Sequence, residues 1–340
     1  MRLTLSSPQQ RCMAWWCALG LMLSCMVLSL MIGARHIALD MLWQAMTSSC
    51  APQQVDCIIV QEARLPRTII GVMVGIALGL SGCLMQQLTR NPLADPGVLG
   101  VNAGASLAVV LCAAFVGTTA ISAFVTAAFA GALVSCSILI VLGIVSGRGR
   151  LDPIRLTLIG VAMGAALEGL ASGVALLDPT TFDRMRFWRT GSLEIHGMVT
   201  IYTVALPMAL GVIIVLSIGR SLEALALGEQ LASSLGSHTR LTQALGIVAI
   251  ALLCGSAVAA VGPIAFLGLM APHLAARLSL GSARWQLYWA LVITPLLLLS
   301  ADIIGRLLFK GEVRVSILTA LLGAPLLIIL ARQLWRGKPA

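Results

Sequence analysis

Charge is scarce in this sequence. Of its 340 residues only 10% are Asp, Glu, Lys or Arg, whereas a globular chain carries about 25%. Apolar residues make up 59% of the chain, and its mean hydropathy is +0.99. Because so few charges cannot cover a water-exposed surface, we exclude a soluble enzyme, a secreted disulfide scaffold and a disordered chain. The composition predicts an all-α polytopic membrane protein whose spans each take about 20 residues.

The signatures of several chemistries are also missing. The phosphate-binding pattern G-x-x-x-x-G-K-[ST] does not occur, since the one Gly-Lys pair, Gly337-Lys338, is followed by Pro339. No CxxC pair occurs and the four His residues are dispersed, so no metal or cofactor is expected. The 22 Lys and Arg residues are scattered singly, without the basic blocks typical of nucleic-acid binding. We therefore expect a non-catalytic chain that binds no nucleic acid, metal or cofactor.

Charge-free apolar runs predict about ten transmembrane helices. Two runs, Pro96–Gly147 and Leu241–Ala276, are long enough for two helices each, with a turn near Gly117-Thr118-Thr119 and a break at Gly262-Pro263. A third run, from Pro153 to Leu177, is interrupted by Glu168. The remaining runs are Cys12–Ala34, Thr68–Thr89, Ile195–Gly219, Trp285–Ala301 and Val315–Ala331.

An even number of spans places both ends of the chain on one side, and the bias of Lys and Arg indicates which side. With residues 1–11 in the cytoplasm, 13 Lys and Arg residues lie on the inner side and nine on the outer side. We therefore expect both termini inside. Residues 35–65 are then the first periplasmic loop and residues 221–238 a cytoplasmic loop, within one transmembrane domain that covers 1–340.

Cys50 and Cys57 lie seven positions apart in the expected outer loop. If this loop faces an oxidising periplasm, a local disulfide between them is expected, and two unpaired thiols are the alternative. The other seven cysteines fall in or beside spans, where Cys behaves as a small hydrophobe.

Three parts of the chain are too polar and too patterned for ordinary loops. They are residues 63–67 (ARLPR) with 89–97 (TRNPLADPG), residues 262–273 (GPIAFLGLMAPH), and residues 301–306 (ADIIGR) with 311–316 (GEVRVS) and 319–325 (TALLGAP). In this order, from about residue 58 to the carboxyl end, the chain resembles the FecCD-type permeases of ATP-driven iron–siderophore, haem and vitamin B12 importers.

The resemblance implies a type II ABC importer in a bacterial inner membrane. Two permease subunits of ten helices would surround a central path, two separate ATPase subunits would use ATP and Mg²⁺, and a periplasmic binding protein would deliver cargo. The loop 50–57, residues 186–188 with 191–193, and the run 311–316 resemble family members that carry ferric enterobactin. This implies a ferric siderophore as cargo and a paralogue as the second permease. Vitamin B12 or haem is the alternative cargo.

The longest inner loop runs from Arg220 to Arg240, and two glycines in it bracket a predicted short helix with two leucines on one face. The resemblance implies that this is the coupling helix, which sits in a groove of the ATPase. A helix lying at the membrane interface is the alternative. The residues concerned are Gly228, Glu229, Leu231, Leu235 and Gly236.

Arg64, Arg67 and Arg306 occupy the positions at which the family docks its binding protein against acidic groups. A rim of guanidinium groups suits carboxylates, because each can bind one through two hydrogen bonds. Simple anchoring is the alternative, since Arg side chains at helix ends extend toward the membrane surface.

Arg184, Arg186 and Arg189 lie between two predicted spans on the outer side. They could form an electropositive mouth for an anionic ferric catecholate, or pair locally with Asp178, Asp183 and Glu194.

Glu168 lies inside a predicted span, where an ionisable group usually faces a cavity or a partner. It could line the path, or be a protonated or hydrogen-bonded structural group. A different class of protein, an ion-coupled secondary carrier, would need paired carboxylates or broken helices at mid-membrane. Glu168 is a lone candidate for that role.

Overall fold

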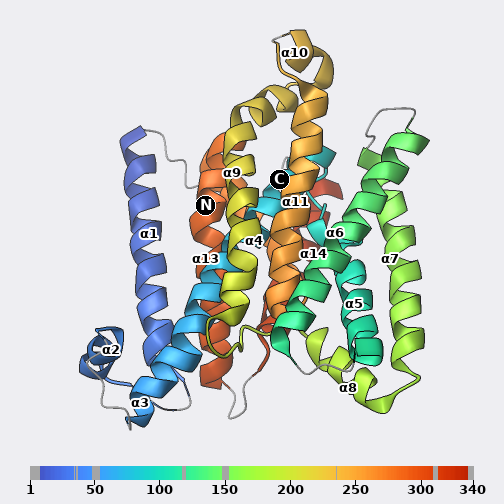
Figure 1. Cartoon of the computed structure of the whole chain (residues 1–340). Coiled ribbons are helices and arrows are strands. Elements are labelled where there is room, and N and C mark those ends of the chain that lie inside the picture. The colour runs from blue at the N-terminus through green and yellow to red at the C-terminus, as the bar shows by residue number, and fades with distance from the viewer. Residues whose placement is uncertain are drawn as a thin grey trace.

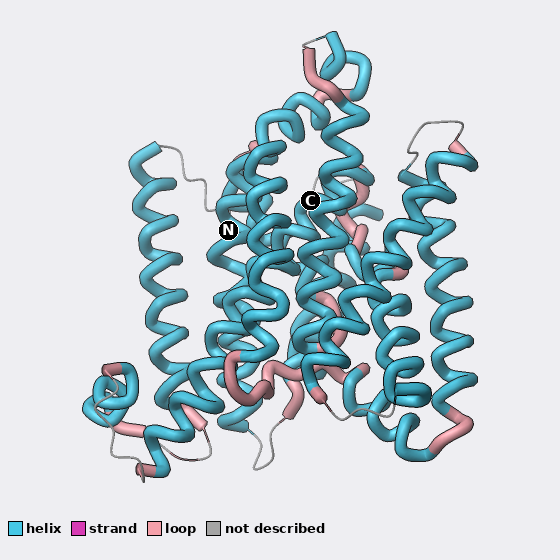
Figure 2. The backbone as a smooth tube through the Cα atoms, in the orientation of Figure 1, coloured by secondary structure: helices cyan, strands magenta, loops and turns pink. Residues whose placement is uncertain are grey.

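The computed structural model describes residues 8–33, 35, 37–47, 54–116, 120–147, 153–234, 236–308 and 313–335. All regular elements within these ranges are helical, as Figures 1 and 2 show. Seven helices among the described residues are long and apolar enough to cross a membrane, and two apolar stretches, Val101–Val116 and Val315–Ile329, are shorter. The prediction of an all-α polytopic protein is confirmed.

The elements follow one another as an up-and-down bundle. Each of the ten predicted spans contains one principal helix, while the number of true spans stays a prediction. The elements are α1 (Pro8–Met31), α2 (Leu39–Met46), α3 (Val55–Ile58), the π-helix η1 (Ile59–Arg64), α4 (Leu65–Thr89), the 3₁₀-helix η2 (Pro96–Leu99), α5 (Val101–Leu111), the π-helix η3 (Cys112–Val116), α6 (Ile121–Ser146), α7 (Pro153–Ala175), α8 (Pro179–Trp188), α9 (Val199–Ala226), α10 (Glu229–Ser234), α11 (Thr239–Val261), α12 (Leu267–Ser279), α13 (Ala283–Leu308) and α14 (Val315–Trp335).

The bundle has two distinct ends. In Figure 1, α10 projects beyond one end, where α1 also begins, and we call this the α10 end. At the opposite end lie α2, α3 and α8, and we call this the α8 end. The turn expected near Gly117 lies outside the described residues.

The expected first outer loop is largely helical, which corrects the sequence interpretation. The segment holds α2, α3 and η1, and an apolar helical run continues without a break from Val55 to Thr89. The periplasmic location of residues 35–65 stays a prediction. The π-helical turn η1 leads directly into α4, and Pro66 stands in the first turn of α4. Proline is tolerated in a first helical turn.

Two reversals of the chain lie inside the bundle and meet there. The predicted break at residues 262–263 is confirmed, because α11 ends at Val261 and α12 begins at Leu267. Gly262 has φ +75°, and a Cβ there would lie 2.4 Å from the Trp188 carbonyl oxygen, so only glycine fits. The other reversal, residues 95–100, places Pro96 against Gly268 of α12. We call these two segments the chain reversals.

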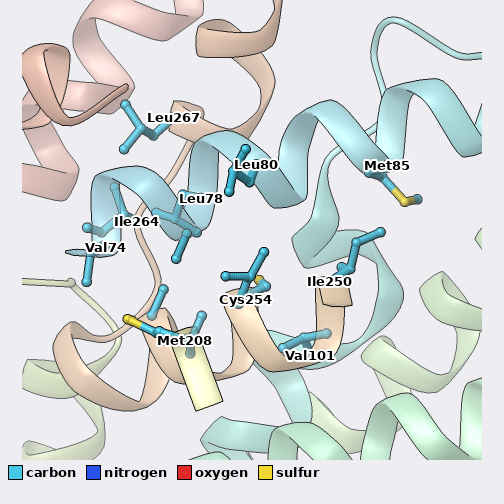
Figure 3. Close-up of a cluster of buried hydrophobic side chains, with 14 of the residues drawn as sticks. Val74, Leu78, Leu80, Met85, Val101, Met208, Ile250, Cys254, Ile264 and Leu267 are labelled. Atoms are coloured by element: carbon cyan, nitrogen blue, oxygen red, sulfur yellow. The ribbon is translucent and has the colours of Figure 1, made fainter. Parts of the chain in front are cut away.

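The core is centred on α4, α11 and α13. Within their apolar windows 78%, 72% and 67% of residues are buried, compared with 17% in α7 and 22% in α1. Figure 3 shows Leu78 of α4, Met208 of α9 and Cys254 of α11 in this core. Glycines allow the close approach: a Cβ on Gly75 would lie 2.5 Å from Pro295 Cα in α13. Helix association in lipid relies on such packing.

The closest approach generates a prediction. A Cβ on Gly82 would lie 1.9 Å from the Gly268 carbonyl oxygen, so the backbones of α4 and α12 must separate to admit it. We expect Gly82→Ala to lower the free energy of unfolding by about 1–3 kcal/mol, the usual cost of overpacking. Thermal unfolding in detergent measures this effect.

The control for that measurement is Gly20→Ala in α1, where a Cβ meets nothing within 4 Å. Because Ala is the better helix former, we expect this variant to be as stable as the natural protein or slightly more so. Equal melting temperatures for the two variants would contradict the close contact between α4 and α12.

Candidate functional site

A buried cluster of charges joins three helices at the α8 end. Arg67 Nη2 lies 2.9 Å from Asp302 Oδ1, and Arg306 Nη2 lies 2.9 Å from Asp302 Oδ2. The carboxylate of Asp302 is 1% exposed, so it binds both arginines away from water. Arg64, Arg67, Asp302 and Arg306 together are called the arginine cluster below.

The arginine cluster also holds the end of α1. Arg64 Nη1 donates to the carbonyl oxygens of Leu30 and Met31, both at 2.7 Å. Arg306 Nη1 donates to those of Ser29, at 3.0 Å, and Ile32, at 2.7 Å. The last carbonyls of a helix have no partner within it and carry partial negative charge. The guanidinium groups supply both the missing donors and the opposing charge.

This geometry corrects the expectation that Arg64, Arg67 and Arg306 form an exposed rim. Arg64 and Arg67 are buried, with 6% and 8% of their surface exposed, and the Arg306 side chain is 4% exposed. The sequence signal that was missed is Asp302, four residues before Arg306, where a helix places the two side chains together. Docking of a binding protein at this end stays a prediction.

The predicted short helix in the loop 221–238 is confirmed as α10. Gly228 and Gly236 flank it with φ +116° and +79°, which glycine adopts without strain. Leu231 is 58% exposed and Leu227, just before the helix, is 62% exposed. Leu235 lies outside the described residues, as does the side chain of Glu229. The result is a projecting tip with apolar groups on its surface (Figure 1).

A hollow of about 440 Å³, here called the inner hollow, opens between the two chain reversals. The Asp95 carboxylate caps the first reversal, because its Oδ1 accepts a hydrogen bond from Gly97 N at 2.8 Å. The buried Oδ1 of Asn102 has no hydrogen-bond partner in the described part of the chain. Polar groups therefore lie deep in an otherwise apolar bundle. Side chains in the lining include Asp95, Asn102, Arg189, Ile264, Phe266 and Ser316.

Glu168 binds Arg189, a lining residue of the inner hollow. Glu168 Oε2 lies 2.6 Å from Arg189 Nη2, and their side chains are 31% and 42% exposed. The pair joins α7 to the segment after α8. The sequence identified both residues but did not pair them with each other.

The other predicted outer arginines are placed differently. Arg186 lies 3.9 Å from Asp183 in an exposed pair, as local pairing predicts. Asp178 caps α8 instead of binding an arginine: its carboxylate accepts hydrogen bonds from Thr180 and Thr181, which lower its pKa to about 2. Neither Arg184 nor Arg186 lines the inner hollow. An electropositive mouth made by all three arginines stays a prediction.

Cys57 is disulfide-bonded. Cys50, its predicted partner, lies outside the described residues, so this pairing stays a prediction. In the described ranges, no three His, Cys, Asp or Glu side chains gather as metal ligands would.

Seven apolar helices of spanning length among the described residues define the class as a polytopic helical membrane protein. The particular family follows from comparison with known proteins. The chain belongs to the FecCD transport family, whose model matches residues 21–333.

Individual relatives agree with this assignment. The chain is 51% identical over 310 residues to the ferric enterobactin transport system permease protein FepD of Escherichia coli K12, a match covering 91% of this chain and 92% of the relative. It is 34% identical to the Fe(3+) dicitrate transport system permease protein FecD of the same organism, covering 88% and 92%. A solved inward-facing metal-chelate type ABC transporter shares 27% identity with a TM-score of 0.82, covering 95% and 99%.

The arginine cluster generates a prediction. Asp302→Asn removes the negative charge that Arg67 and Arg306 share and leaves a neutral amide between two buried guanidinium groups. We expect the free energy of unfolding to fall by about 3–5 kcal/mol, the usual cost of breaking a buried ion pair. Thermal unfolding and the yield of folded protein measure the effect.

The control is Asp183→Asn, which removes an exposed pair of weak geometry and should leave stability unchanged. If Asp302→Asn were as stable as this control, Asp302 would not organise the cluster.

Proposed function

We propose that this chain is the inner-membrane permease subunit of a binding-protein-dependent ABC importer that moves ferric enterobactin from periplasm to cytoplasm. The observation that carries the proposal is the 51% identity to FepD over nine-tenths of both chains. A separate ATPase subunit hydrolyses ATP with Mg²⁺, since this sequence has no phosphate-binding loop. The chain itself binds no cofactor.

The proposed topology has ten spans with both termini in the cytoplasm. The predicted spans each contain a helix, and the Lys and Arg bias favours the α10 end as the inner side. The α8 end then faces the periplasm, where Cys57 can remain oxidised.

The tip at α10 is the proposed contact for the ATPase. Leu227 and Leu231 expose apolar surface on a short helix that extends beyond the bundle. Exposed apolar groups gathered on a projection are typical of a surface that a partner covers. The positive-φ glycines on each side set the direction of the helix.

A second permease subunit, which we propose to be a paralogue, is expected to cover α7. Only 17% of its apolar window is buried, and a Cβ on Gly169 or Gly173 would meet nothing within 4 Å. On α4, by contrast, neighbouring helices occupy the space beside Gly75 and Gly82. Small residues four apart let another helix approach closely. A surface that only contacts lipid chains does not need such residues.

The inner hollow is the proposed contribution of this chain to the cargo path. Arg189 presents positive charge at its lining and is oriented by Glu168. Because Asp95 also lines the hollow, its charged side chains are of both signs, and they do not by themselves favour an anionic cargo over a neutral one. The binding protein docks at the α8 end, and the arginine cluster holds α1, α4 and α13 together beneath that surface.

The cargo prediction is tested in lipid vesicles that hold this chain, its partner permease and the ATPase. We expect ferric enterobactin with its binding protein to stimulate ATP turnover and to accumulate inside, because the cargo and the docked protein together favour the outward-open state. Cobalamin with its own binding protein serves as the comparison. Stimulation by cobalamin alone would reassign the cargo.

The coupling prediction concerns the α10 tip. We expect Leu231→Asp to reduce binding-protein-stimulated ATP turnover at least tenfold, because a charge replaces apolar surface at the proposed contact with the ATPase. Reconstituted turnover, with the amount of bound ATPase measured in parallel, tests this.

The matched control is Leu39→Asp in α2, which is also 58% exposed but lies at the α8 end. It should leave association of the ATPase unchanged. Equal loss of bound ATPase in both variants would mean that Leu231→Asp acts through folding and not through coupling.

A further inference from the structure

A second polar hollow, of about 410 Å³, lies at the α10 end between the ends of α4 and α12 and the start of α13. No Asp or Glu is among its lining residues. Neither the family comparison nor the α10 contact assigns it a role. We call this pocket the basic hollow. The polar side chains that line it are Gln86, Gln87, Arg90, His273, Arg277 and Gln286.

The floor of the basic hollow holds buried polar atoms with no partner among the described residues. His273 is 7% exposed, and its Nε2 makes no hydrogen bond there. Gln87 Oε1 is also buried without a hydrogen-bond partner there, although Gln87 Nε2 donates to Gln286 Oε1 at 3.0 Å. Buried polar atoms are almost always hydrogen-bonded, and an unmet one costs about 1–3 kcal/mol. The floor is therefore prepared for a polar group from outside the chain.

The rim of the basic hollow is positively charged and exposed. Arg277 lies in the last turn of α12, and Arg90 follows α4 with φ +50°, a conformation that costs a non-glycine residue energy. Basic residues at helix ends also oppose the helix dipole. That effect explains the positions of the two arginines but not the unpartnered atoms of the floor.

Contacts place the basic hollow beside the α10 tip. Arg90 Nη2 donates to the Leu225 carbonyl oxygen at 3.0 Å, near the end of α9, and α10 follows three residues after α9 ends. Glu223, a nearby acid on α9, accepts a hydrogen bond from Ser282 Oγ, just before α13. The basic hollow therefore lies close to the segment that leads into α10.

We propose that the basic hollow is a second contact for the ATPase subunit and receives an acidic side chain from it. This inference rests on the proposed function. A carboxylate seated there binds the guanidinium of Arg277 at the rim through one oxygen, and its inner oxygen accepts a hydrogen bond from His273 at the floor. Hydrogen bonds between charged groups are roughly twice as strong as neutral ones, and charge complementarity fixes the register of a docked partner.

The position of this contact gives it a mechanical consequence. Arg90 precedes one chain reversal by five residues, and α12, which carries His273 and Arg277, begins at the other. An ATPase held at both α10 and the basic hollow therefore acts on α4 and α12 as well as on the loop. Its movement reaches the inner hollow directly through α12, and from α4 through the five non-helical residues 90–94.

The test uses the complete complex in lipid. Arg277→Glu is expected to lower the apparent affinity for the ATPase at least tenfold at low salt, and by less at high salt, because salt screens the exposed charge. Arg284→Glu is the matched control, since Arg284 is exposed near the start of α13 and stacks on Tyr288 outside the basic hollow. Equal effects of the two variants would overturn the proposal.

His273→Leu separates binding from folding. Because Nε2 lacks a partner in the described chain, its removal should leave the melting temperature of the isolated permease unchanged or raised, while weakening retention of the ATPase. A lower melting temperature with normal retention would make His273 structural and overturn the proposal. If inorganic phosphate raises the melting temperature and Arg277→Glu binds the ATPase normally, the ligand of the basic hollow is a free anion. The proposed carboxylate of the ATPase would then be wrong.

Failure of this inference is distinguishable from failure of the proposed function. If Leu231→Asp releases the ATPase and Arg277→Glu does not, only the second contact is wrong. If the natural chain retains no ATPase at all, the proposed function itself is wrong.

Discussion

The structure depends on one buried carboxylate. Asp302 is the sole acid in the arginine cluster, and its two oxygens bind Arg67 and Arg306 away from water. Isolated charges at such depth cost several kcal/mol each, and the cost is met only when every group is paired. Arg64 and Arg306 also donate hydrogen bonds to carbonyl oxygens at the end of α1. One acid therefore joins two arginines of α4 and α13, and Arg64 and Arg306 attach the end of α1 to the same cluster.

From this anchored end, α4 runs through the bundle as the most buried of the seven apolar helices of spanning length in the described part of the chain. Arg67 fixes its first turn to α13, and Gly75 and Gly82 bring its backbone against α13 and α12. Near its last turn, Gln86 Nε2 donates to the Leu269 carbonyl oxygen of α12 at 3.1 Å. Such a helix cannot slide past its neighbours without losing contacts along its length. It is suited to transmit displacement as a rigid body between the two ends.

Sequence patterns predicted the elements of this arrangement better than its contacts. Charge-free runs located the helices, and the loss of a donor at residues 262–263 located the break, because both are local properties of the chain. Burial of Arg64 was not predictable in this way, since an arginine beside a span can reach water or the interior equally well. The pair of Glu168 and Arg189 joins residues on different elements across a turn, which no periodicity reports. Asp302 had a local signal, its spacing from Arg306, and could have been found.

The contrast between the two sides of the bundle indicates which surfaces the chain's own helices leave uncovered. Around α4 every close approach is filled, whereas α7 leaves Gly169 and Gly173 open and α10 exposes Leu231. Because helices in lipid gain stability from packing and not from leaving water, an unfilled small-residue surface leaves association energy unused. Anything that binds only the folded chain adds to its stability. In the proposed assembly, partner subunits would supply on the α7 and α10 surfaces the packing that the arginine cluster and α4 supply within the chain.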